Sequence, residues 1–124
     1  MKYSILLTIS LFMVTSTFAQ KKAEVTFTVK AACGMCEERI EDAFDTKGIV
    51  TADYDLNEQK LTVVYKTKHF TDVLHLHKIA TAVGHDTDKL TATNEAYDNL
   101  HGCCKYREGG RKCSGDLEHG QDDE

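Results

Sequence analysis

Two cysteines separated by two residues, Cys33 and Cys36, stand where one hydrophobic pattern gives way to another. Before them, apolar and polar residues alternate over residues 23–29, which is typical of a strand with one buried face. After them, apolar residues recur at helical spacing over residues 36–47. This order places the second thiol in the first turn of a helix, where the positive end of the helix dipole favours thiolate. The two thiols can therefore converge on one thiophilic metal ion.

The rest of the chain continues the alternation of strand and helix patterns. Strands are expected over 49–56 and 61–65, a second helix over 71–83, and a short fourth strand over 88–92. The order βαββαβ predicts an α+β, ferredoxin-like sandwich in which two helices cover one face of a four-stranded antiparallel sheet. Glycines at 48 and 84 are expected to end the two helices. A further short helix is expected over 94–100.

The first 19 residues have the pattern of a secretory signal peptide. A charged start at Lys2 is followed by an apolar run over 5–14 and by small residues ending at Ala19. The run is shorter than the roughly 20 apolar residues that cross a bilayer. We therefore expect cleavage after Ala19, no stable membrane insertion, and a periplasmic or secreted protein.

Charge and length limit what the mature chain can do. The formal net charge is −5, and removing Lys2 with the signal peptide makes it −6. An acidic chain of this kind is not expected to bind nucleic acid, because affinity for phosphates comes from clustered Lys and Arg. The length fits one domain over 23–92, followed by a short cysteine-bearing extension over 93–106. The acidic, glycine-rich tail over 107–124 is expected to be disordered.

Several separate motifs resemble those of one known family in the same order. They are the Cys-x-x-Cys before the first helix, Ile40-Glu41, Gly48-Ile49, the stretch Lys60-Leu61-Thr62-Val63-Val64-Tyr65, and Gly84. Over residues 23–92 the chain resembles the heavy-metal-associated domain, the module of copper chaperones, copper-ATPase N-terminal domains and the periplasmic mercury-binding protein. The resemblance implies a metal site at Cys33 and Cys36. No catalytic triad or paired carboxylates are visible, and we do not expect an enzyme.

Two departures from the family pattern affect the candidate ligands. Lys30-Ala31 stands where the family usually has Gly-Met, and a methionine occurs instead between the cysteines, as Met35. His85 stands where Tyr or Phe is common. In the family's fold this loop approaches the cysteine loop, so His85 could be a third ligand or could face solvent. Met35 could donate its thioether or pack against the loop. His77, on the second helix, is expected near the surface.

The segment His101-Gly102-Cys103-Cys104 is not explained by the resemblance. Adjacent thiols beside a histidine are compatible with a second soft-metal site or with a relay onto the first. A disulfide of Cys113 with Cys103 or Cys104 would instead brace the extension, and the odd thiol could also link two copies. The sequence leaves these alternatives open.

Two thiolates and few other donors suit Cu(I) or Hg(II), whereas Zn(II) prefers four ligands. We therefore expect an exported soft-metal-binding protein or metallochaperone, with Cu(I) as the preferred cargo and Hg(II) or Zn(II) as alternatives. Transfer would proceed by thiolate exchange to a metal-transporting ATPase, an efflux component or another metal-accepting protein. The protein would be a monomer or a metal-linked dimer. The alternatives are a mercuric ion scavenger and a thiol–disulfide exchange protein that uses both cysteine pairs.

Overall fold

The computed structural model describes residues 21–109. The expected signal peptide, most of the expected acidic tail and Cys113 lie outside the described residues. Within them, no helix has both the length and the apolar character needed to span a bilayer.

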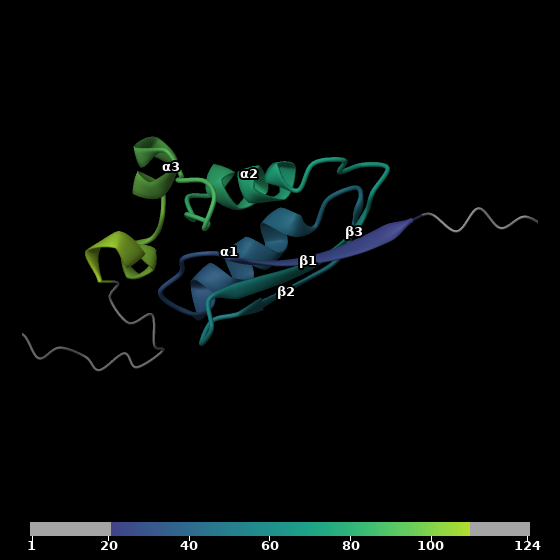
Figure 1. Ribbon diagram of the computed structural model, residues 1–124. Coiled ribbons are helices and arrows are strands. Elements are labelled where there is room, and N and C mark those ends of the chain that lie inside the picture. Colours follow the sequence, from purple (N-terminus) through teal and green to yellow (C-terminus); the bar gives the residue numbers. More distant parts are fainter. Residues whose placement is uncertain (1–20, 110–124) are drawn as a thin grey trace, which may run out of the picture.

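The strands form one antiparallel sheet in the order β1-β3-β2 (Figure 1). The strands are β1 (Lys22–Thr28), β2 (Ile49–Asp55) and β3 (Lys60–Lys66). In the pairing of β1 with β3, Phe27 lies opposite Leu61, and both side chains are buried. The alternation seen in the sequence therefore turns one face of the sheet toward the core.

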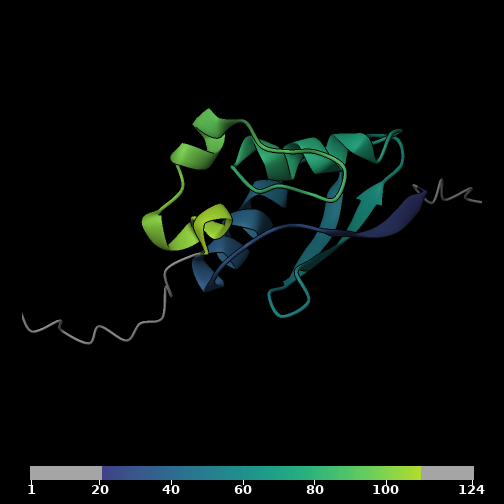
Figure 2. The ribbon, with the colours of Figure 1, turned by 60° about the vertical axis from the view of Figure 1, so that its left-hand side comes forward.

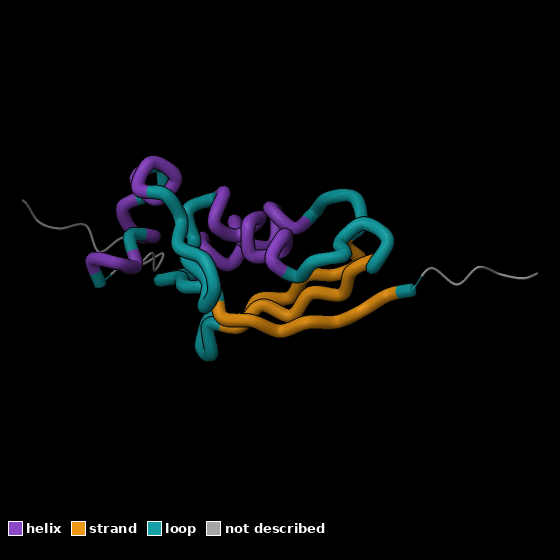
Figure 3. Tube along the Cα trace, turned by 45° about the horizontal axis from the view of Figure 1, so that its top comes forward, coloured by secondary structure: helices purple, strands orange, loops and turns teal. Residues whose placement is uncertain are grey.

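Helices α1 (Gly34–Phe44) and α2 (Leu74–Ala82) both lie on the same side of the sheet (Figure 3). Their apolar stripes are buried, with Ile40 and Phe44 from α1 and Leu76 from α2 all less than 2% exposed. The expected sandwich of two helices on an antiparallel sheet is present.

Gly84 ends the second helical segment for two separate steric reasons. Its φ of +96° lies in the left-handed region, which side chains other than glycine's disfavour. A Cβ atom at this position would also lie 2.7 Å from the carbonyl oxygen of Ala96. The residue therefore both ends the helix and allows the following segment to pack closely against it.

The expected fourth strand over 88–92 is absent from the described residues, and this prediction was wrong. A single bridge joins Val29 to Thr87, with Lys30 N–H donating to Asp86 O at 2.8 Å. The backbone then turns, because Thr87 Oγ1 accepts hydrogen bonds from the N–H groups of residues 89 and 90. These side-chain bonds take the place of a continued ladder. The sheet therefore has three strands.

After this turn the chain folds back beside the start of α1 (Figure 2). The extension contains α3 (Asn94–Asp98) and two short 3-10 turns, η1 (Gly102–Cys104) and η2 (Tyr106–Glu108). The short helix expected over 94–100 is present. Ordered contacts continue through Arg107, past the expected end of the extension at residue 106.

Candidate metal centre

The loop that precedes α1 is held by hydrogen bonds from three directions. Tyr54 Oη of β2 donates to Val29 O at 2.8 Å, and Gln59 Nε2 of the β2–β3 turn donates to Ala31 O at 3.0 Å. From the opposite side, His85 Nδ1 donates to Lys30 O at 2.8 Å. The path of the backbone into the cysteines is therefore fixed before the helix begins.

Cys33 and Cys36 lie in the first turn of α1. Cys33 is the N-cap residue, with extended backbone angles, and its carbonyl accepts a hydrogen bond from Cys36 N–H at 2.9 Å. This geometry brings the two sulfur atoms to 3.5 Å. Unpaired N–H groups at a helix start carry partial positive charge, so negative charge on sulfur is stabilised there.

A third thiol lies at the same place. Cys104 Sγ, from η1, is 3.6 Å from Cys33 Sγ, although the two residues are 71 positions apart. All three thiol side chains are buried, at 6% exposure for Cys33, 0% for Cys36 and 1% for Cys104. The structure thus brings together both main predicted ligands and one of the possible ones.

The three thiols differ in acidity. Burial by itself would raise the pKa of Cys33, but hydrogen bonds from the Cys36 backbone and from the neighbouring thiols outweigh it, and the pKa lies below its ordinary value. Burial raises the pKa of Cys36 and that of Cys104, and the neighbouring Cys36 and Cys33 thiols also raise the pKa of Cys104. Cys33 is therefore the most acidic of the three thiols. A cation held there would stabilise its buried thiolate form.

Cys103 and Met35 lie at the edge of the cluster. Cys103 Sγ is within 4.8 Å of the sulfur atoms of Cys33 and Cys104, and 3.7 Å from Met35 Sδ. Cys103 is disulfide-bonded, however, and thiolate is the form that binds metal. Cys113, the other end of the disulfide suggested by the sequence, lies outside the described residues. Met35 is 44% exposed.

His85 is fully buried, so it does not face solvent. Its Nδ1 donates to Lys30 O, because a carbonyl can only accept, so Nδ1 carries a proton. Burial lowers the pKa of His85, which favours the neutral ring. Nε2 has no hydrogen-bond partner among the described residues. The structure shows His85 bonded to the loop backbone and stacked on the ring of Tyr106.

His77 is also buried, and its expected surface position was wrong. Its ring packs on Phe27 with centroids 4.0 Å apart, and its Nδ1 lies 2.7 Å from Thr87 Oγ1. Burial lowers the pKa of His77, which favours the neutral ring. His77 joins α2 to the bridge that replaces the fourth strand.

The position of Cys104 depends on Tyr106 and Arg107, which the sequence did not single out. Tyr106 Oη donates to Gly84 O and accepts from Asp86 N–H, both at 2.8 Å, and its ring stacks on His85. Arg107 pairs with both carboxylate oxygens of Asp86 at 3.0 and 2.6 Å. We call Tyr106, Arg107, Gly84 and Asp86 the clasp. An isolated Tyr-Arg pair in a polar segment carries no recognisable signal of this role.

Several solved structures are similar to this chain. The CopZ metallochaperone is 22% identical, with a TM-score of 0.49, and the match covers 52% of this chain and 98% of that one. The N-terminal domain of a potential copper-translocating P-type ATPase from Bacillus subtilis, in the Cu(I)-loaded state, is 22% identical with a TM-score of 0.50, and the match covers 54% of this chain and 85% of that one. Oxidised MerP from Ralstonia metallidurans CH34 is 20% identical with a TM-score of 0.49, and the match covers 55% of this chain and 96% of that one. No curated protein matches the sequence significantly.

The family comparison covers the region that holds the cysteine pair. The model of the heavy-metal-associated domain matches residues 17–86, which is more than half of the 124 residues. This range includes the whole sheet, both long helices and the loop with Cys33 and Cys36, and it ends before Cys104. The chain therefore belongs to the heavy-metal-associated domain family.

Proposed function

We propose that this protein binds Cu(I) through Cys33 and Cys36 and passes it to a protein partner. The observation that carries the proposal is the pair of thiols 3.5 Å apart at a helix start, with a lowered pKa at Cys33. Thiolate ligands select soft ions such as Cu(I), and the thiols meet in a buried site that excludes competing water. Membership in the heavy-metal-associated family supports a metal-binding role.

Transfer by thiolate exchange follows from the low coordination number of the ion. A thiolate of the partner can bond to Cu(I) before a thiolate of this chain leaves, so the ion is never released to water. Copper stays Cu(I) throughout, and each departing thiolate takes a proton from solvent. Tight binding and rapid transfer are compatible under this scheme.

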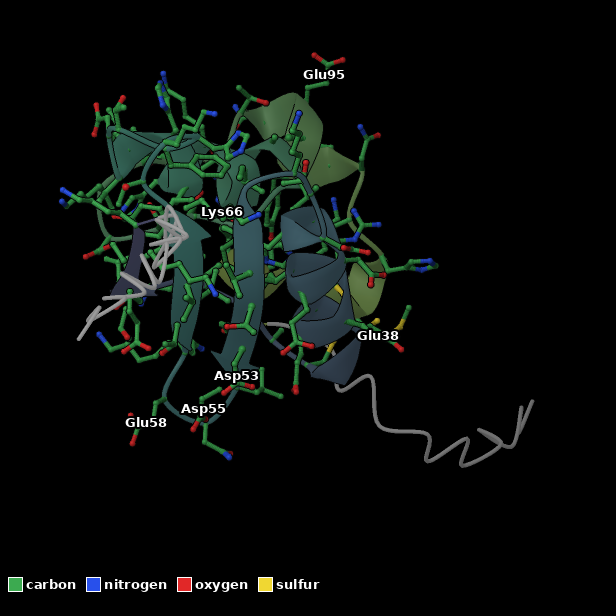
Figure 4. The ribbon with its side chains drawn as sticks, turned by 90° about the vertical axis from the view of Figure 1, so that its right-hand side faces the viewer. Glu38, Asp53, Asp55, Glu58, Lys66 and Glu95 are labelled. Carbon is green, nitrogen blue, oxygen red and sulfur yellow. The ribbon has the colours of Figure 1, made fainter. Side chains whose placement is uncertain are left out.

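The surface near the cysteine loop suits a basic partner. Figure 4 shows Asp53, Asp55 and Glu58 around the β2–β3 turn and Glu38 on α1, and all four are exposed. The β2–β3 turn contacts the cysteine loop through Gln59. An acidic surface beside the cargo would increase the rate of encounter with a positively charged metal-accepting protein. A metal-transporting ATPase domain or an efflux component is the partner we propose.

We further propose that the protein is exported to the periplasm or secreted. The support is the pattern of residues 1–19, which resembles a signal peptide. Mass spectrometry of protein recovered from the producing cells should find an N-terminus at Gln20. An intact N-terminus in the cell extract would contradict export.

The binding proposal is tested by titrating reduced full-length protein with Cu(I) against a competing chelator. We expect one tightly bound Cu(I) per chain, and loss of tight binding in Cys33→Ser and Cys36→Ser. His75→Asn is the matched control, because it removes an exposed potential donor on α2 and should change nothing. Stoichiometric binding that survives both cysteine substitutions would refute the site. The same titration with Hg(II) and Zn(II) ranks the alternative ions.

One observation favours a second candidate function, thiol–disulfide exchange. Cys33 has a lowered pKa and lies next to two further sulfur atoms, which is the arrangement that a thiol relay needs. This candidate predicts turnover in an insulin-reduction assay and no stoichiometric metal. The primary proposal predicts bound Cu(I) and no turnover.

A further inference from the structure

A metal site made of two cysteines does not account for Cys104, which is a buried thiol. It lies beyond the region matched by the family, which ends at residue 86. Its sulfur is nevertheless 3.6 Å from Cys33 Sγ, and its side chain is 1% exposed. A cysteine brought across 71 positions into contact with the candidate ligands requires an explanation of its own.

The approach of Cys104 is supported by specific contacts of the three residues that follow it. The clasp joins Tyr106 and Arg107 to the loop after α2. Lys105 Nζ donates to the carbonyls of Tyr97 and Asp98, at 3.1 and 2.9 Å. The segment that directly follows η1 is thus tied to the domain and to α3, and the Cys104 thiol lies against the cysteine loop.

The spacing of the sulfur atoms favours a shared ion. With metal–sulfur bonds of about 2.3 Å, two sulfurs on opposite sides of an ion are about 4.6 Å apart, and three at the corners of a triangle are about 4.0 Å apart. The observed separations are 3.5 Å for Cys33–Cys36 and 3.6 Å for Cys33–Cys104. Three-coordinate binding therefore requires small movements of the side chains, whereas a linear two-sulfur site requires the pair to spread by about 1 Å.

We propose that Cys104 is the third thiolate ligand of the Cu(I) site, so that the bound ion is three-coordinate and covered by the C-terminal extension. This inference rests on the proposed function. As each Cu–S bond forms, the thiol loses its proton to solvent, and neither copper nor sulfur changes oxidation state. Transfer then begins when the partner's thiolate displaces Cys104. The clasp residues act as positioning residues for Cys104.

Cu K-edge X-ray absorption on the Cu(I)-loaded, full-length protein counts the sulfur neighbours directly. We expect three sulfur neighbours in the wild type and two in Cys104→Ser. The Cu(I) affinity of Cys104→Ser should fall about tenfold or more, since even the loss of an outer-shell partner of a metal ligand costs that much. Cys103→Ser is the matched control: it is the adjacent cysteine and its sulfur lies near the cluster, but its side chain is only partly buried, whereas Cys104 is 1% exposed. It should retain three sulfur neighbours.

The outcomes separate this inference from the function on which it rests. Two sulfur neighbours in the wild type, with binding still lost in Cys33→Ser, would overturn the third ligand and leave the Cu(I) site intact. Loss of the third neighbour in Cys103→Ser instead of Cys104→Ser would overturn the assignment to Cys104. No Cu(I) binding by the wild type would overturn both proposals. Circular dichroism of the metal-free variants verifies folding, and Cys104→Ala replaces Cys104→Ser if the hydroxyl is not tolerated.

Discussion

The cysteine loop and the C-terminal extension deliver sulfur to the same point by different physical means. The loop is part of the regular fold: it connects β1 to α1, and the first helical turn sets the separation of Cys33 and Cys36. The extension contains only short helical segments, and Cys104 is positioned by side chains such as Tyr106 and Arg107. The first arrangement depends on backbone hydrogen bonds and core packing, and the second depends on a few polar pairs.

This difference indicates that the two regions should respond differently to perturbation. A regular element packed on a core unfolds with the whole domain, whereas a segment held by a few partly exposed contacts can detach locally. Detachment of the extension would leave the cysteine pair in place and open the site to a partner. The following predictions test this separation, from the largest expected effect to the smallest.

Ile40→Ala should destabilise both regions at once. Ile40 is a fully buried residue of α1, one turn after Cys36. Truncating a buried isoleucine costs about 2–5 kcal/mol, through lost burial and the cavity left behind. Urea unfolding followed by circular dichroism should show this loss as one cooperative transition. If the domain unfolded normally while the loop alone became disordered, the loop would not share the stability of the core.

Gly84→Ala should loosen the junction between the domain and the extension. The substitution places a Cβ atom 2.7 Å from Ala96 O at a residue with φ of +96°. Backbone strain of this kind costs about 1–3 kcal/mol, and the neighbouring carbonyl must also move. Gly34→Ala is a suitable control for added side-chain bulk, because its Cβ would meet nothing within 4 Å. Equal thermal stability of the two variants would contradict the prediction.

Arg107→Ala should release the extension without unfolding the sheet. It removes both hydrogen bonds to Asp86 and leaves that carboxylate without its guanidinium partner. We expect a cost of about 1 kcal/mol, because the pair is partly screened by solvent. Amide hydrogen exchange should rise over residues 101–108 and stay unchanged in β3. An equal rise in both segments would mean that the extension and the domain form one cooperative unit.

Acid should weaken the same contact. Burial alone would raise the pKa of Asp86, but hydrogen bonds from Arg107 and from Ala92 N–H hold it below the ordinary value of 3.8. A carboxyl group with a depressed folded pKa stabilises the protein above its unfolded pKa, and this contribution disappears as pH falls through the folded pKa. Stability should therefore fall more between pH 5 and pH 2 in the wild type than in Asp86→Asn. Parallel stability profiles would show that the pair contributes nothing.

Met35→Leu should have the smallest effect. Met35 lies between the two ligands in the sequence but is 44% exposed, and its sulfur is 3.7 Å from Cys103 Sγ. Leucine is similar in volume, so Cu(I) affinity and the sulfur count should be unchanged. A weaker affinity would show that the thioether is a ligand.

Much of the domain could be predicted because its elements are encoded locally. The alternation in β1 and β3, the helical stripe with Ile40, and Gly84 each reflect a requirement of one element. The missing fourth strand was not predictable in this way. Residues 88–92 form a turn because Asp86 and Thr87 accept hydrogen bonds from nearby N–H groups, and that competition depends on where the loop lies in space.

The same distinction between local pattern and tertiary contact applies to the residues of the site. The two cysteines were identified because their spacing and position before a helix are visible in the sequence. Cys104 could be named as a candidate ligand. That it contacts Cys33 as a free thiol, whereas Cys103 is disulfide-bonded, could not be predicted. His77 shows the opposite error, since a polar residue taken for surface lies in the core beside Phe27.

By itself, the sequence determined the order of the elements from β1 to α2, the resemblance to the family, and the pair Cys33 and Cys36 at the start of α1, because each of these depends on residues close together in the chain. Only the tertiary structure decided that a third thiol meets them. Contacts such as Arg107 with Asp86 join residues that are 21 positions apart. Their energy depends on distance and burial, which no local pattern records. The cluster of Cys33, Cys36 and Cys104 exists only after both regions have folded together.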